Sequence, residues 1–129
     1  MLCPCGSKHD SASCCAAFIS GLALPPTPEA LMRSRYTAYT QGNIEYIAQT
    51  MAGRAAIGFD PISAKQWALS VIWNKLEVLS SSAQGDKGEV RFKAYFSSAG
   101  KPHIMTEHSL FERINGRWMY VDALNVNNR

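Results

Sequence analysis

The four cysteines of the chain all lie close to its N-terminus. Cys3 and Cys5 flank a proline, whereas Cys14 and Cys15 are adjacent. Zinc takes four thiolate ligands in a tetrahedral arrangement and accepts short spacers between them. The Gly6-Ser7 pair favours a turn that brings the two cysteine pairs together. The spacing therefore predicts one structural zinc ion per chain, with Cys3, Cys5, Cys14 and Cys15 as its ligands.

Two other roles remain open for these thiols. A disulfide is the first, but adjacent cysteines bridge each other poorly and no secretory signal accompanies them. A redox or catalytic thiol is the second, although the C-x-x-C spacing of dithiol oxidoreductases is absent. His9 offers an imidazole in the same segment. Because four thiolates already complete a tetrahedron, we expect His9 to be a surface residue.

The composition is that of one compact domain, with 129 residues and a hydrophobic fraction of 47%. A formal net charge of +3 neither requires nor excludes nucleic acid, and no dense run of Lys and Arg marks a binding surface. The N-terminus lacks the regions of a signal peptide, and no apolar run reaches the length of a membrane span. We therefore expect a cytoplasmic protein with reduced cysteines and no membrane contact.

Helices are expected in the first half of the chain, after the stiff Pro25-Pro26 pair. Thr27 is a typical N-cap and Pro28 a typical first residue for a helix that runs to Gln41. A second helix is expected over residues 44–51. A third begins at Asp60-Pro61, which repeats the cap and the proline, and ends near residue 70.

Arg35 occupies an unusual position on the first of these helices. At 100° per residue it projects into the apolar face, between Leu31 and Tyr39. An unpaired buried guanidinium is costly, so Arg35 must either extend its stem out of the core or find a carboxylate. Glu107 and Asp122 are the expected partners, and such a pair would line a cavity.

Strands are expected in the second half of the chain, where hydrophobic residues alternate with polar ones. A polar loop over 81–88 should separate the first two, and Asn115-Gly116 is a strong hairpin signal before the last. In the last strand, alternation places Trp118, Tyr120 and Asp122 on one face. Helices followed by an antiparallel meander indicate an α+β fold. The four expected strands span 71–80, 89–98, 103–114 and 117–126.

The cysteine segment resembles the SEC-C zinc knuckle, a motif found at the tail of the bacterial preprotein-translocase motor and in many small bacterial proteins. The resemblance rests on Cys3-Pro4-Cys5-Gly6-Ser7 and on Cys14-Cys15. It implies the same four ligands, and it implies that the knuckle (1–22) is a unit separate from the domain over 27–126. Lys8 and Ser11 replace a usual glycine and a usual aromatic residue, and most of the motif's lysines are absent. This loss argues against nucleic acid as a partner.

The rest of the chain resembles the YchJ-like family of uncharacterised bacterial proteins, in which such a knuckle precedes a nuclear-transport-factor-2-like domain. The similarity lies in L-M-R-S-R-Y-T-A-Y at 31–39, E-H-S-L-F at 107–111 and G-R-W-M-Y-V-D at 116–122. It implies a cystatin-like α+β fold, with helices packed on a curved antiparallel sheet. Many relatives carry a second knuckle after the sheet, and this chain has no cysteine there.

The fold class implies a cavity between sheet and helices but does not decide function. Glu107 alternates in phase with Ser109 and Phe111, so His108 should point to the opposite face unless a bulge intervenes. This argues against a catalytic His–Glu pair. The cavity candidates are Arg35, Tyr36, Tyr39, Glu107, His108, Trp118 and Asp122.

Binding is the expected role, with the knuckle contacting a protein partner and the domain offering a small-molecule pocket or a dimerisation surface. A monomer and a homodimer are both open. The first alternative is a cavity enzyme, of isomerase, dehydratase or hydrolase type, that uses Arg35 with Glu107 or Asp122. The second alternative is nucleic-acid binding through the knuckle.

Overall fold

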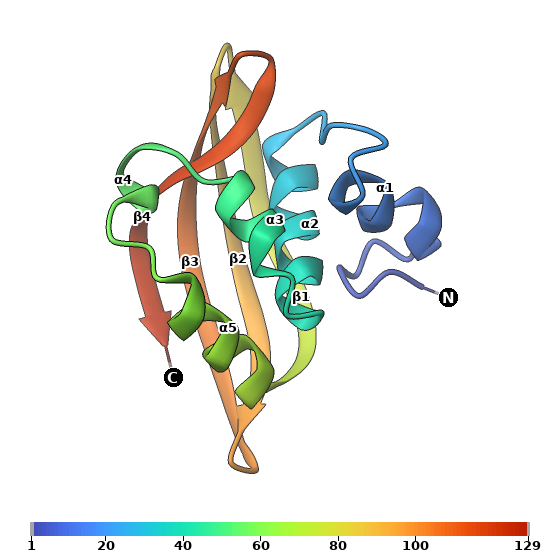
Figure 1. Ribbon diagram of the computed structural model, residues 1–129, viewed down its shortest axis with the longest axis vertical. Coiled ribbons are helices and arrows are strands. Elements are labelled where there is room, and N and C mark those ends of the chain that lie inside the picture. The colour runs from blue at the N-terminus through green and yellow to red at the C-terminus, as the bar shows by residue number, and fades with distance from the viewer. Residues whose placement is uncertain (1, 129) are drawn as a thin grey trace.

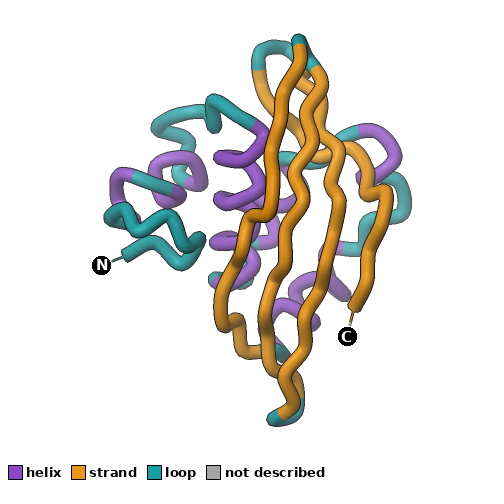
Figure 2. The backbone as a smooth tube through the Cα atoms, turned by 180° about the vertical axis from the view of Figure 1, so that it is seen from behind, coloured by secondary structure: helices purple, strands orange, loops and turns teal. Residues whose placement is uncertain are grey.

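The computed structural model describes the backbone of residues 2–128 and the side chains of residues 2–124. Four antiparallel strands form one curved sheet in the order β1-β2-β3-β4, so every strand pairs with its neighbour in sequence. The helices all lie on one face of this sheet, and Figure 2 shows the other face without any helix across it. This architecture confirms the expected α+β class with helices packed on an antiparallel sheet.

The helices begin where the sequence places their caps. Thr27 accepts a 3.1 Å hydrogen bond from the backbone N–H of Ala30, and Asp60 accepts one of 3.1 Å from the N–H of Ile62. The principal helices are α2 (Pro28–Thr40), α3 (Ile44–Gln49) and α5 (Pro61–Ser70). Shorter elements are the 3-10 helix η1 (Ser11–Ser13), α1 (Cys15–Ile19) and α4 (Gly53–Ala56). No helix among residues 2–128 is both long enough and apolar enough to span a membrane.

The strands are longer than the sequence indicates. They are β1 (Ile72–Gln84), β2 (Lys87–Ser98), β3 (Lys101–Ile114) and β4 (Arg117–Asn128). The loop expected over 81–88 is wrong, because Gln84 pairs with Lys87 and leaves a turn of Gly85 and Asp86. Pairing with β2 overrides the low strand propensity of this polar stretch. At the last hairpin Asn115 and Gly116 both have positive φ, 52° and 79°, as a type I′ turn requires.

A bulge in β4 changes the face on which Asp122 lies. Tyr120 pairs with Phe111, but Asp122 pairs with Leu110, so Val121 is an extra residue opposite this step of β3. Residues opposite each other in a sheet share a face, and Phe111 and Leu110 point to opposite faces. The expectation that Asp122 shares a face with Trp118 and Tyr120 is therefore wrong.

The core lies between α2 and the helix-covered face of the sheet. Leu31, Met32 and Tyr36 on α2 pack against the inward side chains of the strands. Arg35 is also buried there, so its side chain does not extend out of the core. The inward side chains of this cluster are Leu76, Val90, Phe92, Ala94, Phe111 and Trp118.

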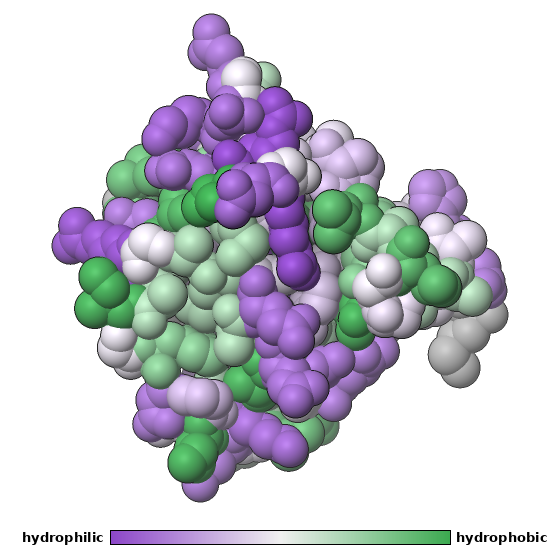
Figure 3. Space-filling model, turned by 45° about the horizontal axis from the view of Figure 1, so that its top comes forward, coloured by the Kyte–Doolittle hydropathy of each residue, from purple (hydrophilic) through white to green (hydrophobic). Residues whose placement is uncertain are grey.

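The N-terminal segment packs against the outer side of α2. Cys3, Cys5 and Cys15 form a small buried cluster of their own, and Thr37 on α2 lies 3.7 Å from the sulfur of Cys3. The backbone of Gly6 comes close to the carbonyl of Leu76 on β1, so that an added Cβ would lie 3.3 Å from that oxygen. The segment forms a lobe at the side of the molecule, as Figure 3 shows.

Candidate metal centre and cavity

The four cysteine sulfurs converge at one point. Their Sγ atoms all lie within 4.8 Å of one another, and all four cysteines are free thiols. The sulfur of Cys14 is 3.7 Å from that of Cys5 and 3.9 Å from that of Cys15. In tetrahedral coordination with metal–sulfur bonds of about 2.3 Å, the sulfur atoms lie about 3.8 Å from one another. The donor set therefore fits a tetrahedral thiolate site and can hold a metal ion.

The protonation of these thiols is uneven. The pKa of Cys5 is lowered to about 4, chiefly because the Cys15 thiol donates a hydrogen bond to its thiolate. The same interaction raises the pKa of Cys15, and burial raises that of Cys14. The neighbouring thiols thus favour the thiolate form of Cys5 over that of Cys14 and Cys15. A bound cation displaces the remaining protons and turns each thiol into a thiolate ligand.

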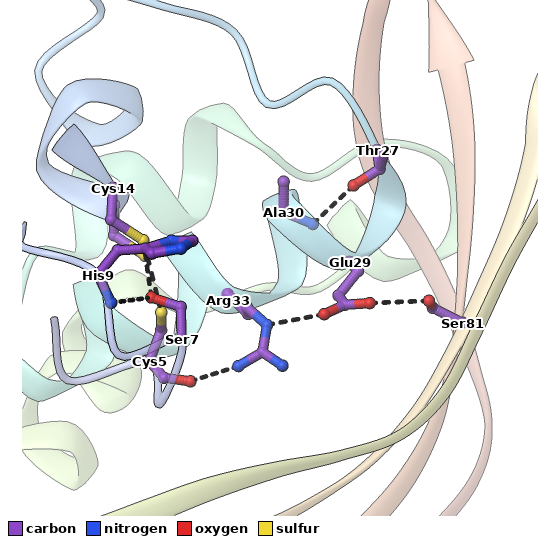
Figure 4. Close-up of polar contacts among 10 residues, drawn as sticks. Cys5, Ser7, His9, Cys14, Thr27, Glu29, Ala30, Arg33 and Ser81 are labelled. Atoms are coloured by element: carbon purple, nitrogen blue, oxygen red, sulfur yellow. Dashed lines mark hydrogen bonds and ion pairs between the residues drawn. The ribbon is translucent and has the colours of Figure 1, made fainter.

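Two hydroxyl groups lie next to the sulfurs. The Ser7 hydroxyl is 3.3 Å from Cys14 Sγ, and Thr37 Oγ1 on α2 is 3.7 Å from Cys3 Sγ. Hydroxyl donors of this kind orient ligands and spread their charge. Ser7 also accepts a hydrogen bond from the backbone N–H of His9, whose side chain is exposed as expected (Figure 4).

A chain of polar contacts joins the cysteine segment to the domain, and Figure 4 shows it from end to end. Arg33 Nη1 donates a 2.6 Å hydrogen bond to the carbonyl oxygen of Cys5. Its Nε contacts Glu29 Oε2 at 2.9 Å, and Glu29 Oε1 accepts a 2.9 Å hydrogen bond from Ser81 on β1. The Arg33 guanidinium lowers the pKa of Glu29, which keeps this carboxylate ionised.

A cavity of about 170 Å³ lies between α2, α5 and the sheet. Its walls are largely aromatic, and its polar groups come from α2, β3 and β4. An apolar cavity of about 150 Å³ accommodates benzene in another protein, so this one has room for a single ring. It is lined by Met32, Arg35, Tyr36, Tyr39, Trp67, Trp73, Phe92, Ala94, Met105, Glu107, Ser109, Phe111 and Tyr120.

Arg35 enters this cavity from α2. Its Nη1 donates to the carbonyl oxygen of Ile47 at 2.9 Å and to Thr50 Oγ1 at 2.6 Å, and its Cζ lies 4.7 Å from the ring centre of Tyr120. Burial lowers the pKa of Arg35, and the nearby Glu107 carboxylate opposes that shift. No carboxylate of a described residue forms a direct ion pair with it. The expected pair with Glu107 or Asp122 is replaced by neutral acceptors and an aromatic face.

Glu107 is the carboxylate of the cavity. Its Oε2 accepts a 3.0 Å hydrogen bond from the Tyr120 hydroxyl and another from the Ser109 hydroxyl. Burial, with the charge of Glu107, raises the pKa of Tyr120, so that the phenol stays a donor. The alternation of β3 predicts this inward position for Glu107 and Ser109. The sequence could have indicated Tyr120 as a cavity residue, because it alternates in step with Trp118 along β4. Nothing in the sequence indicates that Thr50 contacts Arg35.

Of the remaining candidates, two line the cavity and three do not. Tyr36 and Tyr39 line the cavity, whereas Trp118 is buried in the core beside it and donates to the carbonyl oxygen of Pro26 at 3.3 Å. His108 contacts Glu89 on the uncovered face of the sheet, as the alternation predicts. Asp122 does not line the cavity, and its Oδ1 accepts a 2.8 Å hydrogen bond from the N–H of Ala123.

Comparison with known proteins gives matches along most of the chain. The family model described as "YchJ, middle NTF2-like domain" matches residues 27–123. A UPF0225 protein of Actinobacillus succinogenes is 38% identical over 124 residues, which cover 95% of this chain and 80% of that protein. A UPF0225 protein of Streptomyces coelicolor is 39% identical and is matched over 93% of its length, with 94% of this chain covered.

Two solved structures share the whole layout, N-terminal segment included. A SEC-C motif containing protein from Rhodopseudomonas palustris is 34% identical, with a TM-score of 0.90 over 98% of this chain and 100% of that one. A second, from Psychrobacter arcticus, is 27% identical, with a TM-score of 0.83 over 95% of this chain and 81% of that one. With the family match, these similarities show that the chain belongs to the YchJ-like family of bacterial proteins, in which a SEC-C motif accompanies an NTF2-like domain.

Proposed function

We propose that this protein binds a small molecule in the cavity beneath α2 and that its four cysteines hold one structural Zn²⁺. The observation that carries the binding role is the guanidinium of Arg35 at the wall of a largely aromatic cavity. Nη1 is fully engaged, yet no described residue accepts a hydrogen bond from Nε or Nη2. A cation at a cavity wall whose remaining donors no described residue uses can bind an acceptor on a ligand.

Zinc is favoured over calcium and magnesium by the chemistry of the ligands. Four thiolates in a tetrahedral arrangement suit zinc, whereas calcium and magnesium require oxygen ligands. Cys3, Cys5 and Cys15 are buried, so a fourfold thiolate site here is closed and has no open position for a substrate. Zinc in this place supplies a cross-link between the two cysteine pairs. Its contribution is to hold the segment folded against α2.

The cavity chemistry supports binding rather than acid–base catalysis. A guanidinium neither loses nor accepts a proton in the physiological range, so Arg35 cannot act as an acid or a base. Glu107 is the one carboxylate among the described lining residues, and one of its oxygens already accepts hydrogen bonds from two hydroxyl groups. The imidazole of His108, which could have served as its partner, lies on the opposite face of the sheet.

The binding role is tested by a fragment screen that follows the indole N–H signals of the zinc-loaded protein by NMR. Trp67 and Trp73 line the cavity, and Trp118 lies outside it as an internal control. Small single-ring compounds should shift the signals of Trp67 and Trp73 and leave that of Trp118 in place. Fragments that shift all three signals equally, or none, would contradict a ligand site in the cavity.

A further inference from the structure

The cavity carries one cation and one carboxylate, and their balance restricts what it can accept. Arg35 is buried and Glu107 is partly buried, and no other charged side chain lines the described cavity. The two charges influence each other, since Glu107 opposes the effect of burial on the pKa of Arg35. Adding a charged ligand would leave one net charge in a largely aromatic enclosure, which is unfavourable. A neutral ligand preserves the balance.

The free hydrogen-bonding groups define the polar edge of that ligand. The hydrogen bonds of Arg35 to described residues use Nη1, so its donors at Nε and Nη2 can bind an acceptor on a ligand. Glu107 Oε2 accepts from Tyr120 and Ser109, whereas no described residue donates to Oε1, which can accept a hydrogen bond from a ligand. A ligand that satisfies both carries an acceptor beside a donor, as in an amide or a lactam. Either group is neutral.

The walls define the body of the ligand. Trp67 and Trp73 meet edge to face with ring centres 5.2 Å apart, and Tyr39 contacts both of them, at 6.1 and 6.0 Å. Tyr36 adds a further ring, 5.7 Å from Trp73. Aromatic walls favour a planar ring through offset or edge-to-face contacts, and the volume limits the ligand to one ring with a small substituent.

We infer that the cavity selects neutral, planar, single-ring aromatic compounds that carry an amide-type edge, with the carbonyl oxygen on Arg35 and the N–H on Glu107. This inference rests on the proposed binding function and narrows it to one chemical class. Carboxylates would satisfy Arg35 but face the Glu107 carboxylate. Amidinium ions would satisfy Glu107 but face Arg35. Each charged class of ligand therefore gains a contact with one of these two residues and is repelled by the other.

The inference is tested with three isosteres that differ in charge, namely benzoate, benzamide and benzamidine, together with acetophenone, which lacks the donor. Dissociation constants are measured on the full-length zinc-loaded chain from the shifts of the Trp67 and Trp73 indole signals. Benzamide should bind about tenfold or more tightly than each of the other three, because each of them leaves a charged partner unsatisfied. Equal binding of acetophenone and benzamide would overturn the edge assignment while leaving a cavity ligand in place. Absence of any shift with all four compounds would count against the binding function itself.

A charge-changing variant tests the balance directly. Glu107→Gln leaves Arg35 as the one charge among the described lining residues, so benzoate should gain affinity relative to benzamide by about tenfold or more. Asp122→Asn removes the same charge outside the cavity and is the matched control, with an unchanged order of affinities. The inference would be overturned if the ratio of the benzamide and benzoate dissociation constants changed equally in both variants, or changed in neither. Circular dichroism of each variant verifies that the fold is retained.

Discussion

Arg33 on α2 donates a 2.6 Å hydrogen bond to the carbonyl oxygen of Cys5, which places a side chain of the domain against the backbone of the cysteine-bearing turn. Cys5 is fully buried, and its neighbour Gly6 lies against β1. The cysteine segment is therefore in contact with the long helix that also carries Arg35, Tyr36 and Tyr39. We expect the metal centre to stabilise that helix as well as itself.

Replacing Arg33 by methionine tests this connection. The variant keeps much of the apolar stem but loses the contacts to Cys5 and Glu29. We expect it to lower the free energy of unfolding by about 1–3 kcal/mol, the usual effect of losing hydrogen bonds to a charged group. Urea denaturation of the zinc-loaded protein measures this change. Arg54→Met, which removes an exposed arginine on α4, is the control, and equal losses in both variants would refute the connection.

Loss of the metal should affect α2 and not only the cysteine segment. Cys15→Ser removes one thiolate from the buried cluster, and zinc binding in such small sites contributes on the order of 10 kcal/mol to the folded state. We expect faster amide hydrogen exchange in residues 2–22 and also in residues 28–40, since Arg33 and Thr37 lose their ordered partners. Ala12→Ser, at an exposed position, is the control and should leave hydrogen exchange unchanged in both ranges. Protection of α2 that survives metal loss would show that the segment is an independent unit.

The stability of the protein should fall in alkaline solution because of its buried tyrosines. Burial raises the pKa of Tyr36 to about 12, compared with an ordinary value of about 10. The phenol then stays neutral in the folded chain at a pH where the unfolded chain releases the proton. Its contribution is therefore fully present below about pH 10 and is lost as the pH rises towards about 12.

Tyr36→Phe removes this titration while keeping the ring. The variant should lose less stability than the parent protein between about pH 10 and about pH 12, as followed by the urea midpoint at each pH. Tyr39 and Tyr120 also have raised pKa values, so some decline remains in both proteins. If the urea midpoints of the two proteins fell by the same amount between about pH 10 and about pH 12, the raised pKa of Tyr36 would not be a cause of the decline.

Much of the fold follows from local sequence signals. The Thr27-Pro28 and Asp60-Pro61 starts fix two helices, because each cap residue satisfies free backbone N–H groups of its own helix. The alternation of β3 places Glu107 inward and His108 outward, and the structure confirms both. The extra residue at Val121 could not be predicted, since a bulge depends on pairing with β3 and not on the composition of β4. Strict alternation along β4 therefore predicts the wrong face for Asp122.

The surroundings of the candidate sites depend on long-range contacts. Arg33 and Glu29 have the spacing of a helical ion pair, but nothing in the sequence indicates that Arg33 reaches Cys5 or that Glu29 reaches Ser81. Likewise, helical periodicity places Arg35 on the apolar face of its helix, whereas its burial and its acceptors on Ile47 and Thr50 depend on how the following residues pack. A protein partner at the knuckle, the oligomeric state and the cytoplasmic location stay predictions.

The central claim is that Cys3, Cys5, Cys14 and Cys15 together hold one zinc ion. X-ray absorption at the zinc edge, on protein purified without chelator and shown by native mass spectrometry to carry metal, tests it most directly. We predict one zinc per chain and a single shell of four sulfur atoms at about 2.3 Å, as in other tetrathiolate sites. A shell that contains nitrogen would assign a role to His9 and contradict the fourfold thiolate centre. A folded chain without metal, with its thiols oxidised or free, would contradict the zinc site altogether.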